Sequence, residues 1–202
     1  SAVNTNIAAS ELFLDSAQIR KNVVSRAKDL GFIPQSETGA TAIIDMTLSG
    51  VKNADDTYPT TSEMSISRGT VFNTTFDGTT YKFIVPTTLK PTQSGDSYIY
   101  NNVSLVQGTY ATDTFVYDSQ LSNPKFVLSN KRVDKSRIQI NVNSNGIITT
   151  YSLSTNISNI TTTSKVFYEQ ENEDGHREIY FGDGVLGQKL LDGDIITVTY
   201  II

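Results

Sequence analysis

Apolar residues in the first fifty positions follow a helical period and then a strand period. Between Asp15 and Gly31 the apolar side chains recur every three or four residues and form one stripe, made of Ile19, Val23, Ala27 and Leu30. Asp15 is suited to cap the first turn, Gly31 to take a left-handed closing conformation, and Pro34 to prevent continuation. From residue 41 to 48 the pattern alternates with period two. We therefore expect a helix that leads into a strand over residues 15–49.

Short apolar or alternating runs, separated by turn residues, fill most of the remaining chain. Two dipeptides suited to positive φ angles, Asp77-Gly78 and Asn145-Gly146, predict tight hairpins. The predicted strands are 70–76, 79–85, 98–106, 114–117, 125–128, 137–142, 147–153, 165–169, 178–181 and 195–201. Turns at about ten-residue intervals are typical of an antiparallel sandwich or barrel-like sheet.

These patterns predict an α+β, mainly β fold. A short N-terminal helix–strand unit is followed by an antiparallel β-rich sandwich or barrel-like domain. The predicted divisions are a helix-plus-strand segment at 1–50, an aperiodic loop or hinge at 51–61, and a β-rich domain at 62–202. Residues 195–202 form an apolar end without a polar tail. We therefore expect a segment of a longer polypeptide, in which this end is an edge that contacts a further part of the protein.

Composition excludes several classes of function. The chain has 202 residues, of which 38% are hydrophobic, so it is long enough to bury a core. Its 16 basic and 21 acidic residues give a net charge of −5, which argues against nucleic acid or an anionic membrane as the main partner. Cysteine is absent and His176 is the only histidine, so thiolate sites and multi-histidine metal sites are excluded. No apolar run approaches the length of a membrane span.

One acidic cluster has three interpretations. Its members are Glu169, Glu171, Glu173, Asp174 and the nearby Asp183. Carboxylates gathered in this way can bind Ca²⁺, although the order of ligands found in an EF-hand is missing. An exposed hairpin loop at 171–175 explains the cluster equally well, with His176 as a solvated turn residue at its edge. Glu169 and Asp183 are also a conceivable acid pair for glycoside hydrolysis, but a chain with 21 acids offers many such pairs.

The glycines near the C-terminus have a structural explanation. Gly182-Asp183-Gly184-x-x-Gly187 superficially resembles a phosphate-binding loop, but it lacks the Gly-Lys-Ser/Thr ending. Gly182 and Gly184 permit a sharp reversal after a strand, and Asp183 can accept hydrogen bonds from backbone N–H groups inside the turn. Gly193 predicts a second turn before the last strand. We therefore expect no catalytic, cofactor-binding or metal-binding residues here.

Four blocks of sequence occur in a fixed order along the chain. The first, at 13–34, contains the capped helix with Asn22-Val23-Val24 and ends in Leu-Gly-Phe-Ile-Pro. The second, at 66–83, contains Gly-Thr-Val-Phe before Asp-Gly, and the third, at 126–134, contains Phe-Val-Leu before Arg-Val-Asp. The fourth, at 178–200, contains Phe-Gly-Asp-Gly and then Gly187, Gly193 and Tyr200.

Together these blocks resemble the baseplate-J-like family of contractile phage tails. The Asn-Val-Val helix and the Ser-, Thr- and Asn-rich β segments make the T-even-type baseplate wedge members the closer likeness. Phe32 stands where the family usually has Tyr, and Leu190-Leu191-Asp192 stands where many members carry prolines. These departures concern the subfamily.

The resemblance implies a structural, non-enzymatic subunit of a baseplate wedge. We expect it to form a ring around the tail hub with copies of itself and other wedge proteins, as a homo-oligomer in the full-length assembly, and to rearrange on contraction. It implies no cofactor, no nucleic acid and no membrane partner, and a location in the virion after assembly in the host cytoplasm.

Two other classes of function remain open. A β-rich adhesin or receptor-binding module of a fibre or bacterial surface would use Tyr-rich loops such as 98–100 for recognition. It would not require the first and fourth blocks. A glycan-cleaving tail enzyme would require an acid pair that the sequence does not single out.

Overall fold

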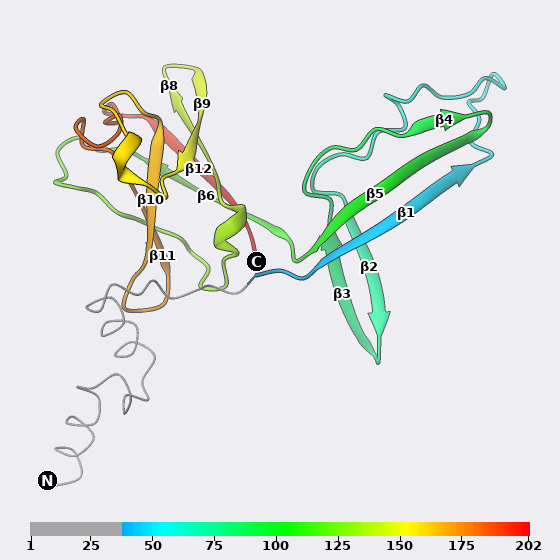
Figure 1. Ribbon diagram of the computed structural model, residues 1–202, viewed down its shortest axis with the longest axis horizontal. Helices are drawn as coiled ribbons and strands as arrows, with labels where there is room; N and C mark the ends of the chain where they lie inside the picture. Colours follow the sequence, from blue (N-terminus) through cyan, green and yellow to red (C-terminus); the bar gives the residue numbers. More distant parts are fainter. Residues whose placement is uncertain (1–37) are drawn as a thin grey trace, which may run out of the picture. The chain divides into compact units, whose positions relative to one another are not determined.

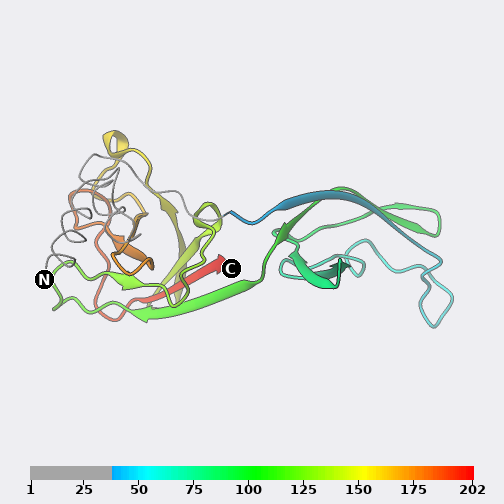
Figure 2. The ribbon, with the colours of Figure 1, turned by 90° about the horizontal axis from the view of Figure 1, so that it is seen from below.

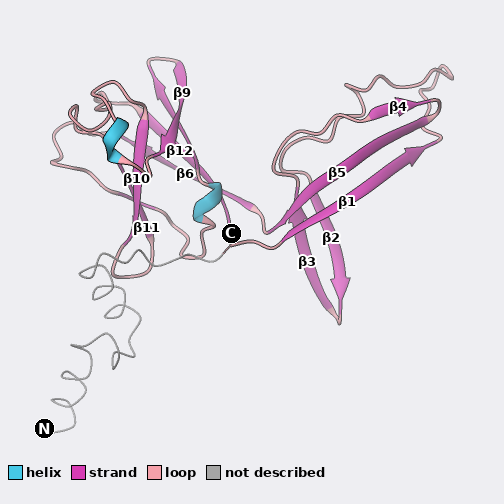
Figure 3. Cartoon of the chain, viewed as in Figure 1, coloured by secondary structure: helices cyan, strands magenta, loops and turns pink. Residues whose placement is uncertain are grey.

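The computed structural model describes residues 38–202, which form strands and loops almost throughout (Figures 1 and 3). Within this range the helical elements are two short 3-10 turns, Lys135–Arg137 and Ile157–Asn159. The prediction of a mainly β chain is confirmed. The predicted helix at 15–30 lies outside the described residues, so the helix–strand unit is not supported as a whole. Its strand is present as β1, Thr41–Ser49. Among residues 38–202, no helix has the length and apolar character needed to cross a membrane.

The described residues divide into two compact units. The N-terminal unit comprises Thr38–Ala111 together with Ile201–Ile202, and the described part of the C-terminal unit is Thr112–Tyr200. Residues 51–61 lie in the N-terminal unit and contain no helix or strand. The divisions expected from the sequence, at 1–50, 51–61 and 62–202, stay a prediction about domain organisation.

The N-terminal unit is built on one antiparallel sheet. After β1 its strands are β2 (Val71–Phe76), β3 (Thr79–Ile84), β4 (Thr92–Ser94) and β5 (Ser97–Gln107). Their order is β1-β5-β3-β2, and β4 also pairs with β5. Asp77 and Gly78 join β2 to β3 with φ angles of 48° and 74°, which confirms the predicted hairpin. The short strand β4 was not predicted, because its sequence Thr-Gln-Ser has no apolar residue.

Buried tyrosines connect the sheet of the N-terminal unit to the loop that precedes β2. Tyr98 and Tyr100 on β5 are 0% and 5% exposed. The Tyr98 hydroxyl donates to the carbonyl of Pro59, and the Tyr100 hydroxyl donates to the carbonyl of Met64. Burial raises the pKa of both phenols, so they remain neutral donors at ordinary pH. An irregular segment is thereby held against the sheet at two points.

The C-terminal unit contains a curved seven-stranded sheet. Its strands are β6 (Tyr110–Val116), β7 (Phe126–Val127), β8 (Gln139–Ser144), β9 (Ile147–Leu153), β10 (Val166–Glu171), β11 (Arg177–Phe181) and β12 (Ile195–Ile201). The order is β6-β12-β8-β9-β10-β11-β7. Asn145 and Gly146 close the β8–β9 hairpin with φ angles of 50° and 86°, as predicted. The sheet is not wholly antiparallel, because β9 and β10 pair in parallel after a connection through residues 154–165.

The two outer strands of this sheet are joined by side chains. Phe115 on β6 packs against Phe126 on β7 with ring centroids 5.3 Å apart. Beside them, the Asp113 carboxylate accepts hydrogen bonds from the backbone N–H and hydroxyl of Ser129, both at 2.8 Å, and from the Tyr200 hydroxyl at 2.7 Å. Burial opposes ionisation of Asp113, but these bonds outweigh it and lower the pKa of the carboxyl. These contacts between β6 and β7 give the sheet a barrel-like, partly closed form.

The last strand occupies a central position, contrary to expectation. β12 lies between β6 and β8, and Figure 2 shows it beside β6. Ile196, Val198 and Tyr200 on this strand have no solvent exposure. The expectation that this strand is a sheet edge is therefore wrong, because β6 and β8 lie on either side of it. A contact of its exposed end, Ile202, with a further part of the protein stays a prediction. Apolar character indicated burial, but it did not distinguish a covered strand from an uncovered one.

The Asp113 network predicts a pH-dependent loss of stability. Because the pKa of Asp113 is lowered in the folded state, its contribution is present above the unfolded pKa and is lost as the pH falls through the folded pKa. We expect Asp113→Asn to lower the free energy of unfolding at pH 7 by about 1–3 kcal/mol, because charge-assisted bonds are lost. The deficit should shrink below about pH 4, where the wild-type carboxyl also becomes protonated.

Chemical unfolding measured at several pH values tests this expectation. Asp77→Asn, in the exposed turn between β2 and β3, is the matched control and should change stability by less than about 0.5 kcal/mol. A deficit for Asp113→Asn that stays constant from pH 7 to pH 3 would contradict the role given to its charge.

Candidate functional site

The acidic cluster is divided between the interior and the surface. Glu169 and Glu171 are two residues apart on β10 and face the same side as Arg177 on β11. The Arg177 guanidinium lies 3.2 Å from a Glu169 oxygen and 3.5 Å from a Glu171 oxygen, and all three side chains are at most 8% exposed. The sequence predicted Glu171 in an exposed loop. Its side chain belongs instead to a buried ion triad.

The turn that follows is organised by Asn172. Its side-chain oxygen accepts from the backbone N–H of Asp174 at 3.0 Å and of His176 at 2.9 Å. Glu173 and Asp174 are exposed. Within residues 38–202, no group of three or more His, Asp or Glu side chains is placed to hold a metal ion. The carboxylates that suggested calcium are thus distributed over an ion triad and a surface turn.

His176 connects this hairpin to the segment after β7. Its Nδ1 atom lies 2.8 Å from the carbonyl oxygen of Leu128, and the side chain is half-buried. The prediction of a solvated turn residue is therefore wrong. Antiparallel pairing of β7 with β11 brings the Leu128 carbonyl to the ring, a contact across 48 positions that no local pattern reveals.

The Phe-Gly-Asp-Gly segment forms a closed turn after β11. An oxygen of Asp183 accepts from the backbone N–H groups of Val185 and Leu186, both at 2.9 Å, and these bonds lower the pKa of the Asp183 carboxyl. The N–H of Gly184 donates to the carbonyl of Gly187 at 3.0 Å. This confirms the turn expected for Asp183. The two carboxylates considered as an acid pair have different partners, because Asp183 accepts backbone N–H groups of its own turn and Glu169 pairs with Arg177.

Gly182 is required for a reason that the sequence did not indicate. Its φ angle is not positive, unlike those of Gly184 and Gly187, at 94° and 93°. A Cβ atom on Gly182 would instead lie 2.3 Å from the backbone carbonyl carbon of Gly187. The turn also docks on another loop, because the N–H of Gln188 donates to the carbonyl of Ser164 at 2.8 Å. The glycines therefore serve close backbone packing as well as reversal.

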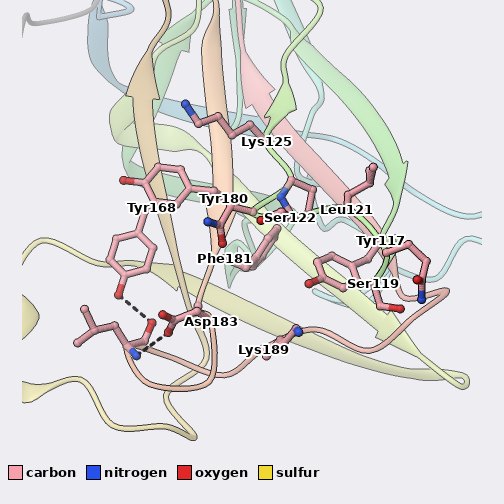
Figure 4. A pocket seen from close by; sticks show the side chains of 15 residues that line it. Tyr117, Ser119, Leu121, Ser122, Lys125, Tyr168, Tyr180, Phe181, Asp183 and Lys189 are labelled. Carbon is pink, nitrogen blue, oxygen red and sulfur yellow. Dashed lines mark hydrogen bonds between the residues drawn. The ribbon is translucent and has the colours of Figure 1, made fainter.

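A pocket of about 710 Å³ lies beside this turn, entirely within the C-terminal unit (Figure 4). One wall is the segment between β6 and β7, and the opposite wall comes from β10, β11 and the Asp183 turn. The lining residues are Tyr117, Ser119, Gln120, Leu121, Ser122, Asn123, Pro124, Lys125, Tyr168, Tyr180, Phe181, Gly182, Asp183, Leu186 and Lys189. They come from separate parts of the sequence, so no single motif predicted the pocket.

Aromatic rings form much of this pocket. Tyr168 and Tyr180 are cross-strand partners, and their rings stack with centroids 5.2 Å apart. The Tyr168 hydroxyl donates to the carbonyl of Leu186 at 3.1 Å. Burial raises the pKa of Tyr117 and Tyr180, so both phenols remain neutral. Figure 4 shows the labelled aromatic side chains and the two lysines, Lys125 and Lys189, around the same space. A cavity of this size, lined by aromatic rings and a few polar groups, can bind a ligand.

Comparison with known proteins agrees with the division into units. Residues 111–201 match the family model described as bacteriophage baseplate wedge protein gp6, third domain. The match begins and ends within one residue of the C-terminal unit, Thr112–Tyr200. This unit is similar to a baseplate wedge domain.

The similarity extends beyond that unit. Over 199 residues the chain is 25% identical to the baseplate wedge protein gp6 of Enterobacteria phage T4, which covers 97% of this chain. The chain spans 28% of the length of that relative. Both similarities are to baseplate wedge proteins of phages.

The ion triad predicts a large cost for removing its cation. Arg177→Met would leave two buried carboxylates without their cation, and we expect the free energy of unfolding to fall by about 3–5 kcal/mol. Lys52→Met is the matched control, because Lys52 forms an exposed ion pair with Asp56 at 2.7 Å. That pair should contribute about 1 kcal/mol or less. Equal effects of the two substitutions on urea-induced unfolding would contradict the role of burial.

The glycine contact predicts a difference between two alanine substitutions. At Gly193 the φ angle is 81° and no atom lies within 4 Å of an added Cβ, so alanine should cost only about 1 kcal/mol of backbone strain. At Gly182 the added Cβ meets backbone, which cannot move without disturbing the turn, and we expect a cost of about 3 kcal/mol or more. Thermal unfolding of the two variants measures this difference, and we expect the lower melting temperature for the alanine at position 182. Similar melting temperatures would argue against the packing requirement.

Proposed function

We propose that this chain is part of a structural subunit of a contractile-tail baseplate wedge. The observation that carries the proposal is the match of one compact unit to a wedge domain, together with similarity over nearly the whole chain. The baseplate-J-like grouping suggested by the four sequence blocks stays a prediction. In the proposed assembly the chain contacts copies of itself and other wedge proteins, in a ring around the tail hub.

The physical properties of the C-terminal unit suit a building block. Its outer strands are joined through Asp113, its β10–β11 hairpin contains a buried ion triad, and its glycine turn is packed against backbone. Each feature penalises local deformation. A rigid unit transmits displacement of its neighbours instead of absorbing it, which is what a wedge subunit needs if it rearranges during contraction.

The proposed subunit is not an enzyme and takes no cofactor. Its partners are proteins, and not nucleic acid or membrane, which agrees with the net charge of −5. It forms a homo-oligomer in the full-length assembly, which takes place in the host cytoplasm before the protein is located in the virion.

The adhesin alternative loses its main argument. The tyrosines at 98–100 were expected in recognition loops, but Tyr98 and Tyr100 lie on β5 with their rings buried. Their hydroxyls bind backbone carbonyls of the same unit. Ile99 lies between them on the strand. The residues proposed to contact a receptor therefore act as core residues of the N-terminal sheet.

Antibody labelling of purified contractile particles, viewed by electron microscopy, tests the proposed location. We expect label confined to the plate at the end of the sheath. Pre-incubation of the antibody with the purified 202-residue chain should remove the label and provides the control. Label on fibres, or on cell surfaces with bare particles, would overturn the baseplate proposal and restore the adhesin.

A further inference from the structure

Three side chains make the rim of the Figure 4 pocket unusually apolar for a surface. Leu121 and Leu186 line the pocket with 57% and 44% of their surface exposed, and the adjacent Val185 is 69% exposed. Single exposed apolar residues are common, but a group of them around a concave aromatic site is typical of a binding surface. The pocket volume of about 710 Å³ is large enough to accept several side chains.

The exposed position of Leu186 is imposed by its backbone. Its N–H donates to Asp183 and its carbonyl accepts from the Tyr168 hydroxyl, so both polar groups of this residue are fixed from opposite sides. The facing wall is fixed as well, because the N–H of Ser119 donates to the Asp192 carboxylate at 2.9 Å. Hydrogen bonds to the backbone thus hold the segments that carry the apolar rim side chains in place. Such fixation is not needed for a surface loop without a function.

The charges of the pocket indicate what kind of segment would fit. Lys125 is half-exposed and lies 3.3 Å from a Glu178 oxygen, so its charge is offset by the chain itself. The Asp183 carboxylate accepts two backbone N–H groups. Lys189 has no ion-pair or hydrogen-bond partner among the described residues. Among the described residues, Lys189 is therefore a cation of the lining without an ion-pair partner, at a site that combines polar, aliphatic and aromatic side chains.

We propose that this pocket is a docking site for a neighbouring protein, which inserts an apolar segment with a carboxylate that pairs with Lys189. Leu121, Val185 and Leu186 contact the apolar side chains, and the Tyr168–Tyr180 pair forms the floor beneath them. A glycan would use the aromatic faces but would gain nothing from three exposed aliphatic side chains. The identity of the neighbour as a wedge protein rests on the proposed function, whereas the chemistry of the segment does not.

Site-specific cross-linking in assembled particles tests this proposal. The photoreactive residue p-benzoylphenylalanine replaces Leu121 in the full-length protein, and mass spectrometry identifies the peptide to which it is joined after irradiation. We expect one peptide of a neighbouring protein, with apolar residues next to Asp or Glu. The same probe at Ile148, which is 68% exposed on β9 but does not line the pocket, is the control and should not join that peptide.

Charge variants then separate docking from folding. Lys189→Glu should lower the yield of the Leu121 cross-link about tenfold, because repulsion replaces attraction to the carboxylate, and Lys189→Arg should preserve it. Lys165→Glu makes the same change at an exposed lysine outside the pocket and should have no effect. Thermal unfolding of the purified chains should be unchanged by all three substitutions. If Lys189→Glu unfolds normally but, unlike the other two variants, does not enter particles, this result would support docking in the same way as the lost cross-link.

Several results would overturn the proposal. They are no cross-link from position 121 in assembled particles, a cross-linked peptide without a carboxylate, a glycan in place of a peptide, and equal yields for Lys189→Glu and Lys165→Glu. Failure of the baseplate proposal is recognised separately, because antibody label would then lie elsewhere while the cross-link could still be formed in those particles.

Discussion

The contact between the two outer strands of the seven-stranded sheet is the constraint on which the C-terminal unit depends. An open sheet of this size exposes one face and two edges, and β7 is only two residues long. Phe115 and Phe126 bring β6 and β7 together, and Asp113 ties β6 to Ser129, two residues after the end of β7. Next to this contact, the ring of Phe181 packs edge to face against those of Phe126 and Tyr151. The interior and the position of the pocket walls follow from this closure.

Local sequence chemistry predicted the parts of the fold that are determined locally. Asp77-Gly78 and Asn145-Gly146 indicated both tight hairpins, because few residues accept two consecutive positive φ angles. Asp183 indicated a turn, since a short carboxylate next to glycines readily binds backbone N–H groups. Alternation indicated β1 and β12 as strands. In each case the residues that cause the structure are neighbours in the chain.

Features that depend on distant pairing were out of reach. The burial of Glu171 depends on the register of β10 with β11, which places Arg177 opposite it. The parallel pairing of β9 with β10, and the central position of β12, depend on the order of strands in the sheet. The pocket combines a loop after β6 with a turn after β11, so its aromatic and basic residues show no common spacing. Amino-acid type indicated burial or exposure, but it did not identify the partner.

The buried triad of Arg177, Glu169 and Glu171 also has a consequence for how the chain selects its pairing while it folds. Side chains alternate between the faces of a strand, so a slip of β10 against β11 by one residue would turn both carboxylates away from the guanidinium. Three apolar side chains at these positions would lose only some packing in such a slip. A guanidinium left inside the unit without its carboxylates would cost much more free energy. The charges therefore discriminate against a misaligned hairpin more strongly than they stabilise the aligned one. Correct alignment of this hairpin also sets the Tyr168–Tyr180 stack, so an error of one residue in the pairing would also disrupt the wall of the pocket.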